Sequence, residues 1–194
     1  MANFFNKTDL SRNDAEKIIS ETLNNCDDGE LYLENSKSES ILLDDGKNKN
    51  STYSSDLGYG LRAVTGEVVA YSHSNEISKN SLKQSADNLS STLKSKKGVY
   101  NHKIPKTNEQ FYKNINPIEE KSLQSKLELL KEVYNYTRAK KGIVQQVTAS
   151  FSGEHKSIEI IRSGGEVLTD VRPLIRFNVS VTVSYTHLTL PTTR

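Results

Sequence analysis

One stretch decides the fold of this chain: Leu57-Gly58-Tyr59-Gly60-Leu61-Arg62-Ala63-Val64-Thr65-Gly66-Glu67-Val68-Val69-Ala70-Tyr71. Two runs of small and apolar residues are separated here by a pair that ends in glycine. This pattern is typical of an antiparallel β-hairpin, because a tight turn needs residues that tolerate a positive φ. The sequence therefore predicts a strand over 57–64, a turn at 65–66 and a return strand over 67–71.

The same stretch satisfies the pattern G-x-G-x-x-G/A. In dinucleotide-binding proteins that pattern joins a strand to a helix, whose N-terminus then faces the pyrophosphate. Here the turn at 65–66 leads into another strand, so no helix N-terminus is available for a phosphate. We therefore interpret Gly58 and Gly60 as strand positions where another backbone packs close.

A second hairpin is predicted just before this one. Leu31 and Leu33 alternate with polar residues, and Ile41-Leu42-Leu43 leads into Asp44-Asp45-Gly46. An Asp-Gly pair between apolar strands is a strong short-range turn signal. The two hairpins together predict a four-stranded antiparallel meander.

One helix is predicted before the meander in the sequence and one after it. Ser11 and Ser78 are good N-caps, and each precedes an apolar stripe at helical spacing. The first stripe consists of Ala15, Ile18, Ile19 and Leu23, and the second of Leu82, Ala86, Leu89 and Leu93.

The second half of the chain again reads as a helix followed by strands. A helix is predicted over 118–141, and from Ile143 onward polar and apolar residues alternate, which is typical of strands. We place Glu154-His155 in a turn between strands and predict further strands over 167–171 and 174–183. The buried side of the helix is predicted to hold Leu123, Leu127, Leu130, Tyr134 and Arg138.

These predictions give an α+β fold class, with two antiparallel sheet regions on which helices pack and with the second sheet truncated. Residues 1–98 are expected to form an N-terminal α+β domain, 99–117 a connector, and 118–183 the start of a second domain. The final stretch, 184–194, holds 4 Thr and no Asp, Glu, Lys or Asn. This composition resembles the translated read-through of a sequencing adapter, so we expect the chain to be the front part of a longer protein.

Charge and composition exclude several kinds of partner. The formal net charge is +2, so neither a nucleic acid nor a membrane is expected as a partner. No signal peptide or membrane-spanning run is visible, and we expect a cytoplasmic protein. The single cysteine, Cys26, excludes an intrachain disulfide and is interpreted as a small buried side chain. No two histidines lie three or four residues apart, so no helical zinc-binding pair is present.

The chain carries, in this order, the blocks Leu31-Tyr32-Leu33, Leu42 to Gly46, Gly58 to Glu67, Ile77-Ser78 with Leu82, Gln84-Ser85-Ala86, Val147 to Gly153 and Asp170 to Leu174. These blocks resemble the N-terminal part of the TldD/PmbA family, and its TldD branch in particular. The resemblance extends from about residue 11 to residue 183 and stops where the Thr-rich tail begins.

The resemblance implies that the full-length protein is a zinc metalloprotease of a family also described as DNA gyrase modulators. A TldD-type subunit would pair as a dimer with a related subunit and cleave unfolded or extended peptides in an enclosed cavity. The family binds zinc through two histidines of an H-E-x-x-x-H helix and a later cysteine, with the glutamate as general base. No such motif occurs in this sequence. It is expected after Val183, so this chain alone is expected to bind no zinc and to be inactive.

No catalytic, cofactor-binding or metal-binding residue is therefore assigned. The resemblance instead implies that matched positions serve the fold or the subunit interface, namely Gly58, Gly60, Arg62, Gly66, Asp170, Arg172 and Pro173. Arg62 and Arg172 are expected to form buried or interfacial ion pairs, since a guanidinium fork matches a carboxylate. The alternative interpretation is a non-catalytic module that binds peptides or partners by strand pairing at exposed sheet edges.

Overall fold

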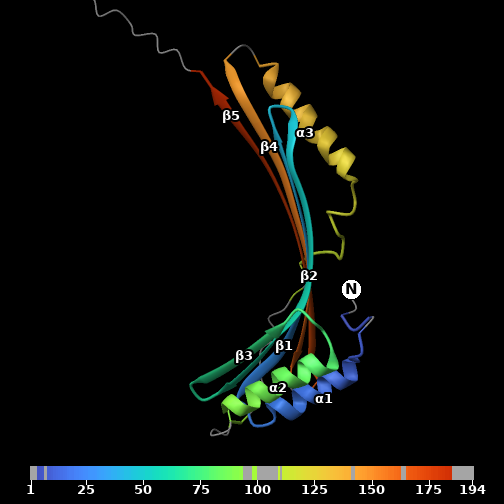
Figure 1. Ribbon diagram of the computed structural model, residues 1–194, viewed down its shortest axis with the longest axis vertical. Coiled ribbons are helices and arrows are strands. Elements are labelled where there is room, and N and C mark those ends of the chain that lie inside the picture. The colour runs from blue at the N-terminus through green and yellow to red at the C-terminus, as the bar shows by residue number, and fades with distance from the viewer. Residues whose placement is uncertain are drawn as a thin grey trace, which may run out of the picture. The chain divides into compact units, whose positions relative to one another are not determined.

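The computed structural model describes residues 4–6, 8–93, 98–99, 109, 111–140, 143–162 and 165–184 (Figure 1). The strands in this part of the chain form one five-stranded antiparallel sheet in the order β3-β2-β1-β4-β5. The expected α+β class is confirmed, and the two expected sheet regions belong to one sheet. The elements are α1 (Arg12–Leu23), β1 (Asp28–Asp44), β2 (Lys47–Thr65), β3 (Val68–Ser74), α2 (Lys79–Leu93), α3 (Leu123–Arg138), β4 (Val144–Arg162) and β5 (Val167–Val183).

The predicted four-stranded meander is a three-stranded one, because β2 runs without a break from Lys47 to Thr65. The sequence suggests two strands there, since residues 50–56 hold a single aromatic residue, Tyr53, and show no apolar alternation. All of them are exposed. Backbone pairing continues through such a stretch even though no side chain there is buried, and Thr52 and Tyr53 are of residue types that fit a pleated surface well.

A similar correction applies to the second half. Strand β4 continues through Glu154 and His155, where the sequence suggested a turn. His155 is buried at 8% exposure rather than solvated. Strand β5 likewise runs through Pro173. Strand β5 lies at one edge of the sheet. Proline, which has no backbone N–H, is tolerated in an edge strand because only one side of that strand pairs with a neighbour.

The chain divides into two compact units, and each unit is made of three separate segments of the sequence. Unit 1 comprises residues 1–37, 54–115 and 155–173, and unit 2 comprises 38–53, 116–154 and 174–194. Four strands contribute residues to both units. The linear division at a 99–117 connector stays a prediction, because most of that connector lies outside the described residues. The same holds for the 184–194 tail, of which Ser184 alone is described.

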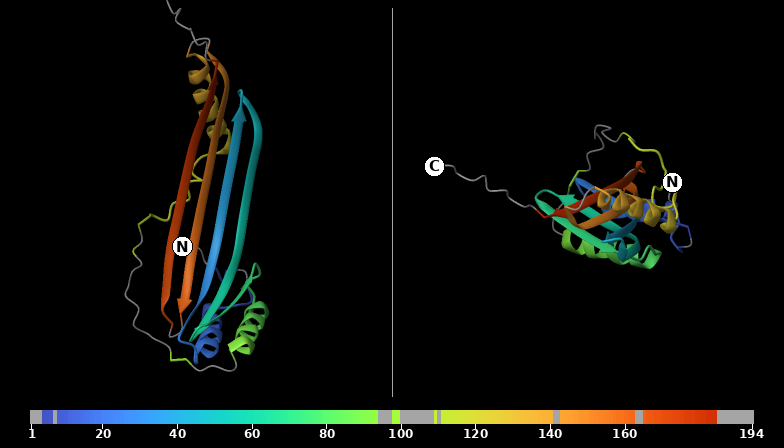
Figure 2. Two further views of the ribbon diagram at one scale, coloured as in Figure 1. Left: turned by 90° about the vertical axis from the view of Figure 1, so that its left-hand side faces the viewer. Right: turned by 90° about the horizontal axis from the view of Figure 1, so that it is seen from above.

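In unit 1, α1 and α2 lie side by side against the sheet (Figure 2). Helix α1 begins after Ser11, whose hydroxyl accepts a hydrogen bond from the backbone N–H of Asp14 at 3.1 Å. Both predicted apolar stripes are buried, as is Cys26. Strand residues that complete this core are Leu31, Leu33, Tyr59, Leu61, Ala63, Ala70 and Ile161.

In unit 2, α3 packs on the sheet through Leu130, which is fully buried with Ile41 and Leu43. The helix begins at Leu123 rather than at 118, because Ser122 caps it by accepting a hydrogen bond from the N–H of Ser125. The prediction that Leu123 is buried is wrong, since 46% of it is exposed in the first helical turn.

The predicted turns have the backbone geometry that their residues suggest. Asp45 and Gly46 have φ values of 47° and 75°, so both central positions of the β1–β2 turn are left-handed. Gly66 in the β2–β3 turn has a φ of 59°. These values are costly for most residues but not for glycine, and they are tolerated by aspartate.

Candidate functional site

All seven candidate residues lie in unit 1. Gly58, Gly60 and Arg62 belong to β2, and Gly66 lies in the turn that follows it. Asp170, Arg172 and Pro173 belong to β5, which β1 and β4 separate from β2 in the sheet. The structure therefore places the two groups of candidates on strands that do not pair with each other.

Arg62 lies in a cluster of charges on one face of the sheet. Its guanidinium donates to Asp28 at 2.6 Å and to Glu30 at 3.2 Å. Arg162, on β4, donates to the other carboxylate oxygen of Asp28 at 2.6 Å. Asp28 thus bridges two arginines that are distant in sequence. Sequence reasoning did not identify Asp28 and Glu30, although their spacing of two puts both on one face of a strand.

The contacts within this cluster favour the ionised forms of Asp28 and Arg62. Burial raises the pKa of Asp28, but the hydrogen bond and charge of Arg62 and the charge of Arg162 outweigh it, so the pKa is lowered overall. Burial lowers the pKa of Arg62, while its contacts with Asp28 and Glu30 raise it by more. The cluster therefore stays charged at neutral pH.

Arg172 has a different environment. It donates to Asp170 at 2.8 Å, two residues away on the same strand, and its side chain is 65% exposed. The carboxylate of Asp170 also accepts a hydrogen bond from the backbone N–H of Val171 at 2.8 Å. Arg172 is thus available on the surface of unit 1, whereas Arg62 is about one-third exposed, at 34%.

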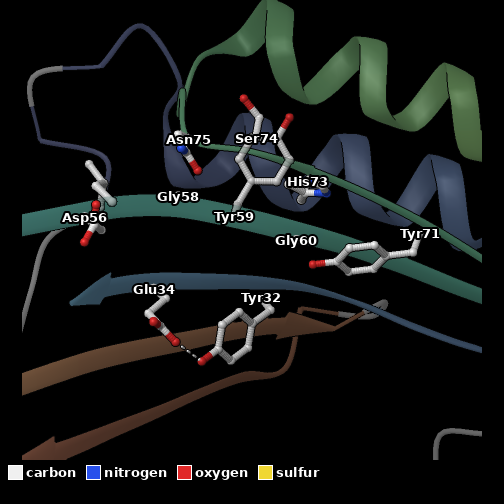
Figure 3. A pocket seen from close by; sticks show the side chains of 11 residues that line it. Tyr32, Glu34, Asp56, Gly58, Tyr59, Gly60, Tyr71, His73, Ser74 and Asn75 are labelled. Atoms are coloured by element: carbon white, nitrogen blue, oxygen red, sulfur yellow. Dashed lines mark hydrogen bonds between the residues drawn. The ribbon is translucent and has the colours of Figure 1, made fainter.

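The two glycines of β2 flank close contacts with β3. A Cβ on Gly58 would lie 2.8 Å from the carbonyl oxygen of Ser74, and one on Gly60 would lie 2.5 Å from the hydroxyl of Tyr71. Close packing of another backbone is thus found at Gly58, whereas the close neighbour of Gly60 is a side chain. Beside them is an open pocket of about 280 Å³ (Figure 3). Its other lining residues are Tyr32, Glu34, Asp56, Leu57, Tyr59, His73 and Asn75.

The described part of the chain offers no fitting site for zinc, which the resemblance implies for the full-length protein. Among the residues that the structure describes, no three or more His, Cys, Asp or Glu side chains gather as metal ligands would. His73 stacks on Tyr71 with a centroid distance of 5.8 Å. Burial raises the pKa of the Cys26 thiol, and the charge of Asp27 adds to this effect. No reaction step is assigned to a metal here.

The family model described as "PmbA/TldA metallopeptidase domain 1" matches residues 29–93 of this chain. The model for the central domain of the same family matches residues 116–188. The chain belongs to the TldD/PmbA family.

Curated relatives of this TldD/PmbA chain carry the name Metalloprotease TldD homolog. One from Buchnera aphidicola of Acyrthosiphon pisum is 35% identical over 158 residues, which are 81% of this chain and 33% of the relative. One from Haemophilus influenzae is 33% identical over 165 residues, covering 82% of this chain and 34% of the relative. The chain therefore spans about a third of the length of these relatives.

Solved structures support the same fold. A Bacteroides thetaiotaomicron protein, named as a candidate modulator of DNA gyrase, superposes with a TM-score of 0.69 at 17% identity, covering 89% of this chain and 41% of that one. A similarly named Thermotoga maritima protein gives a TM-score of 0.60 at 13% identity, covering 84% and 40%. Separately, none of the described helices is both long enough and apolar enough to cross a membrane.

Proposed function

We propose that this chain is the N-terminal scaffold and assembly part of a TldD-type zinc metallopeptidase that works in the cytoplasm on unfolded or extended peptides. The observation that carries this proposal is the match of the first and central family domains, in order, to residues 29–93 and 116–188. The name Metalloprotease of the relatives supports the peptidase class. A related subunit of the same family is the proposed partner in a dimer.

The chain by itself is proposed to be inactive. This part of the proposal is supported by the sequence, which has no H-E-x-x-x-H motif, and by the described residues, which offer no cluster of metal ligands. The purified chain with added zinc is expected to leave a fluorogenic, flexible peptide intact. The complete reading frame, produced with a related subunit, is the positive control. Cleavage by the chain alone that a chelator abolishes would contradict this expectation.

Within the scaffold, we propose that Arg62 serves the fold and that Arg172 serves contact with the partner subunit. Arg62→Ala removes two ion pairs with Asp28 and Glu30, and it is expected to lower the free energy of unfolding by about 1–2 kcal/mol. Arg172→Ala removes an exposed, local pair with Asp170, which is expected to change stability by no more than about 0.5 kcal/mol. Urea unfolding measures both.

Assembly provides the second measurement for these variants. In the full-length protein, Arg172→Ala is expected to weaken binding of the related subunit in size-exclusion chromatography without lowering the melting temperature. Wild-type melting of Arg62→Ala together with wild-type assembly of Arg172→Ala would refute the proposed roles.

A second candidate function is a non-catalytic module that binds partners by strand pairing. It is favoured by β5, whose residues from Leu174 to Val183 are all exposed at an edge of the sheet. Such an edge offers backbone donors and acceptors to another strand. The complete reading frame separates the two functions, because the peptidase requires H-E-x-x-x-H followed by a cysteine.

A further inference from the structure

Strand β5 carries a stripe of partly exposed apolar side chains in unit 2. Successive side chains of a strand point to opposite faces, so the odd-numbered residues of β5 share one face. Ile175 lines an open cavity of about 390 Å³ with Leu129 of α3 and Phe151 of β4, so this face is the one on which α3 packs. The β5 stripe consists of Ile175, Phe177, Val179, Val181 and Val183, which are 38–44% exposed.

Helix α3 leaves the β5 stripe open. The helix packs over β1 and β4 rather than over β5, and the buried residues of that contact are Leu130, Ile41, Leu43, Ala149 and Phe151. Leu129, which shares the cavity with Ile175, is itself 48% exposed. In the described part of unit 2, the β5 stripe is therefore an apolar surface beside the helix rather than part of the core beneath it.

The backbone of β5 is open along one side as well. In the described part of the chain β5 is the last strand of the sheet, so its outer N–H and C=O groups face no neighbouring strand (Figure 2). Natural edge strands are commonly protected by charged side chains, but Arg176 is the only charged residue from Leu174 to Val183. A partner that covers both the stripe and the backbone edge must itself be a strand, because a helix would leave the backbone groups unpaired.

The sequence of the β5 stripe is complementary to itself. When two identical strands pair antiparallel about a two-fold axis through one residue, residues at equal distances on either side of it lie opposite each other. Val179 is the centre of the stripe, so an axis through it matches every apolar residue with another. The pairs are then Ile175 with Val183, Phe177 with Val181, and Val179 with its own copy. Such cross-strand apolar pairs are what stabilises an antiparallel ladder.

The opposite face of β5 is compatible with the same pairing. Arg176 would lie opposite Thr182, and Asn178 opposite Ser180, so no two like charges would face each other. A short peptide added to β5 would itself present a new open edge, whereas two-fold pairing closes the edges of both β5 strands at once. These observations favour a second copy of the chain over a peptide.

We propose that β5 pairs antiparallel with β5 of a second copy of this chain, about a two-fold axis through Val179. The inference rests on strand pairing, the second candidate function above, and names its partner. Self-association of the chain requires neither zinc nor a related subunit, so its test does not depend on peptidase activity. Binding of the related subunit is measured separately with Arg172→Ala in the full-length protein, which keeps the two possible failures distinguishable.

Sedimentation velocity of the purified chain over a range of concentrations tests this pairing. The wild-type chain is expected to show a reversible equilibrium between monomer and dimer. Val179→Lys would place two ammonium groups opposite each other at the axis, and it is expected to weaken dimerisation at least about tenfold. Val69→Lys is the matched control, because it makes the same change at a 60% exposed valine of β3, the other edge strand. It is expected to leave the equilibrium unchanged.

A mixture of two variants tests the two-fold register. Val179→Glu alone is expected to weaken dimerisation as Val179→Lys does. An equimolar mixture of the two is expected to dimerise at least about tenfold more tightly than either alone, because opposite charges then meet at the axis. Circular dichroism checks that each variant is folded. A wild-type chain that stays monomeric at every concentration would overturn the proposal. Equal losses in Val179→Lys and Val69→Lys, or a mixture no tighter than its components, would overturn it too.

Discussion

Replacing Lys126 with methionine is expected to lower the free energy of unfolding of unit 2 by about 3–5 kcal/mol. Lys126 lies on α3 with a side chain that is 6% exposed, and it forms an ion pair with Glu39 of β1, which is 11% exposed. Its ammonium also donates to the carbonyl of Ile118 at 2.6 Å and lies 5.5 Å from the ring centre of Phe151. Methionine fills a similar volume but leaves the carboxylate of Glu39 buried and without its counter-charge.

Two companion variants identify the cause of the loss. In Lys126→Met/Glu39→Met both charges are absent, and most of the stability is expected to return, because a buried ion pair replaced by apolar residues is often neutral. Lys131→Met changes an exposed lysine of the same helix, with an expected effect within about 0.5 kcal/mol. Urea unfolding followed by circular dichroism measures all three. A double variant no more stable than Lys126→Met would show that the lost charge pair is not the cause.

The same lysine illustrates what the sequence could and could not predict. Helix α1 was predicted with its cap and its complete buried stripe, because Ser11 and the apolar spacing are local signals. For α3, the predicted stripe correctly includes the buried Leu130, but it begins at Leu123, which is exposed, and it omits the buried Lys126. A lysine is interpreted as exposed unless its partner is known, and Glu39 is distant in the sequence.

Long-range pairing also explains why the sequence does not reveal the ion-pair partners of Arg62. Arg62 was identified as a candidate for an ion pair, but its partners Asp28 and Glu30 lie more than thirty residues away, with sequence separations of 34 and 32. Their proximity follows from the neighbouring positions of β1 and β2 in the sheet. Hairpin turns, by contrast, were predicted at residue level, because Asp45-Gly46 and Gly66 have local conformational preferences.

Replacing Asp28 with asparagine is expected to lower the free energy of unfolding at neutral pH by about 2–3 kcal/mol. The carboxylate accepts hydrogen bonds of 2.6 Å from both Arg62 and Arg162. The Arg162 side chain is 8% exposed, so loss of the negative charge next to it is costly. Asp28 itself is 36% exposed, and solvent screening keeps the effect below that of Lys126→Met. Asparagine preserves the shape and removes the charge.

The dependence of this difference on pH separates charge from packing. Since the folded-state pKa of Asp28 is lowered from 3.8, its contribution is complete above that value and is lost as the pH falls through the lower, folded-state pKa. The stability gap between wild type and Asp28→Asn is therefore expected to be constant near neutrality and to shrink below pH 3.8. Asp14, Asp27 and Asp44 also have lowered pKa values, but they act equally in both proteins and cancel in the difference. A gap that persists unchanged in acid would mean that Asp28 acts through packing rather than through its charge.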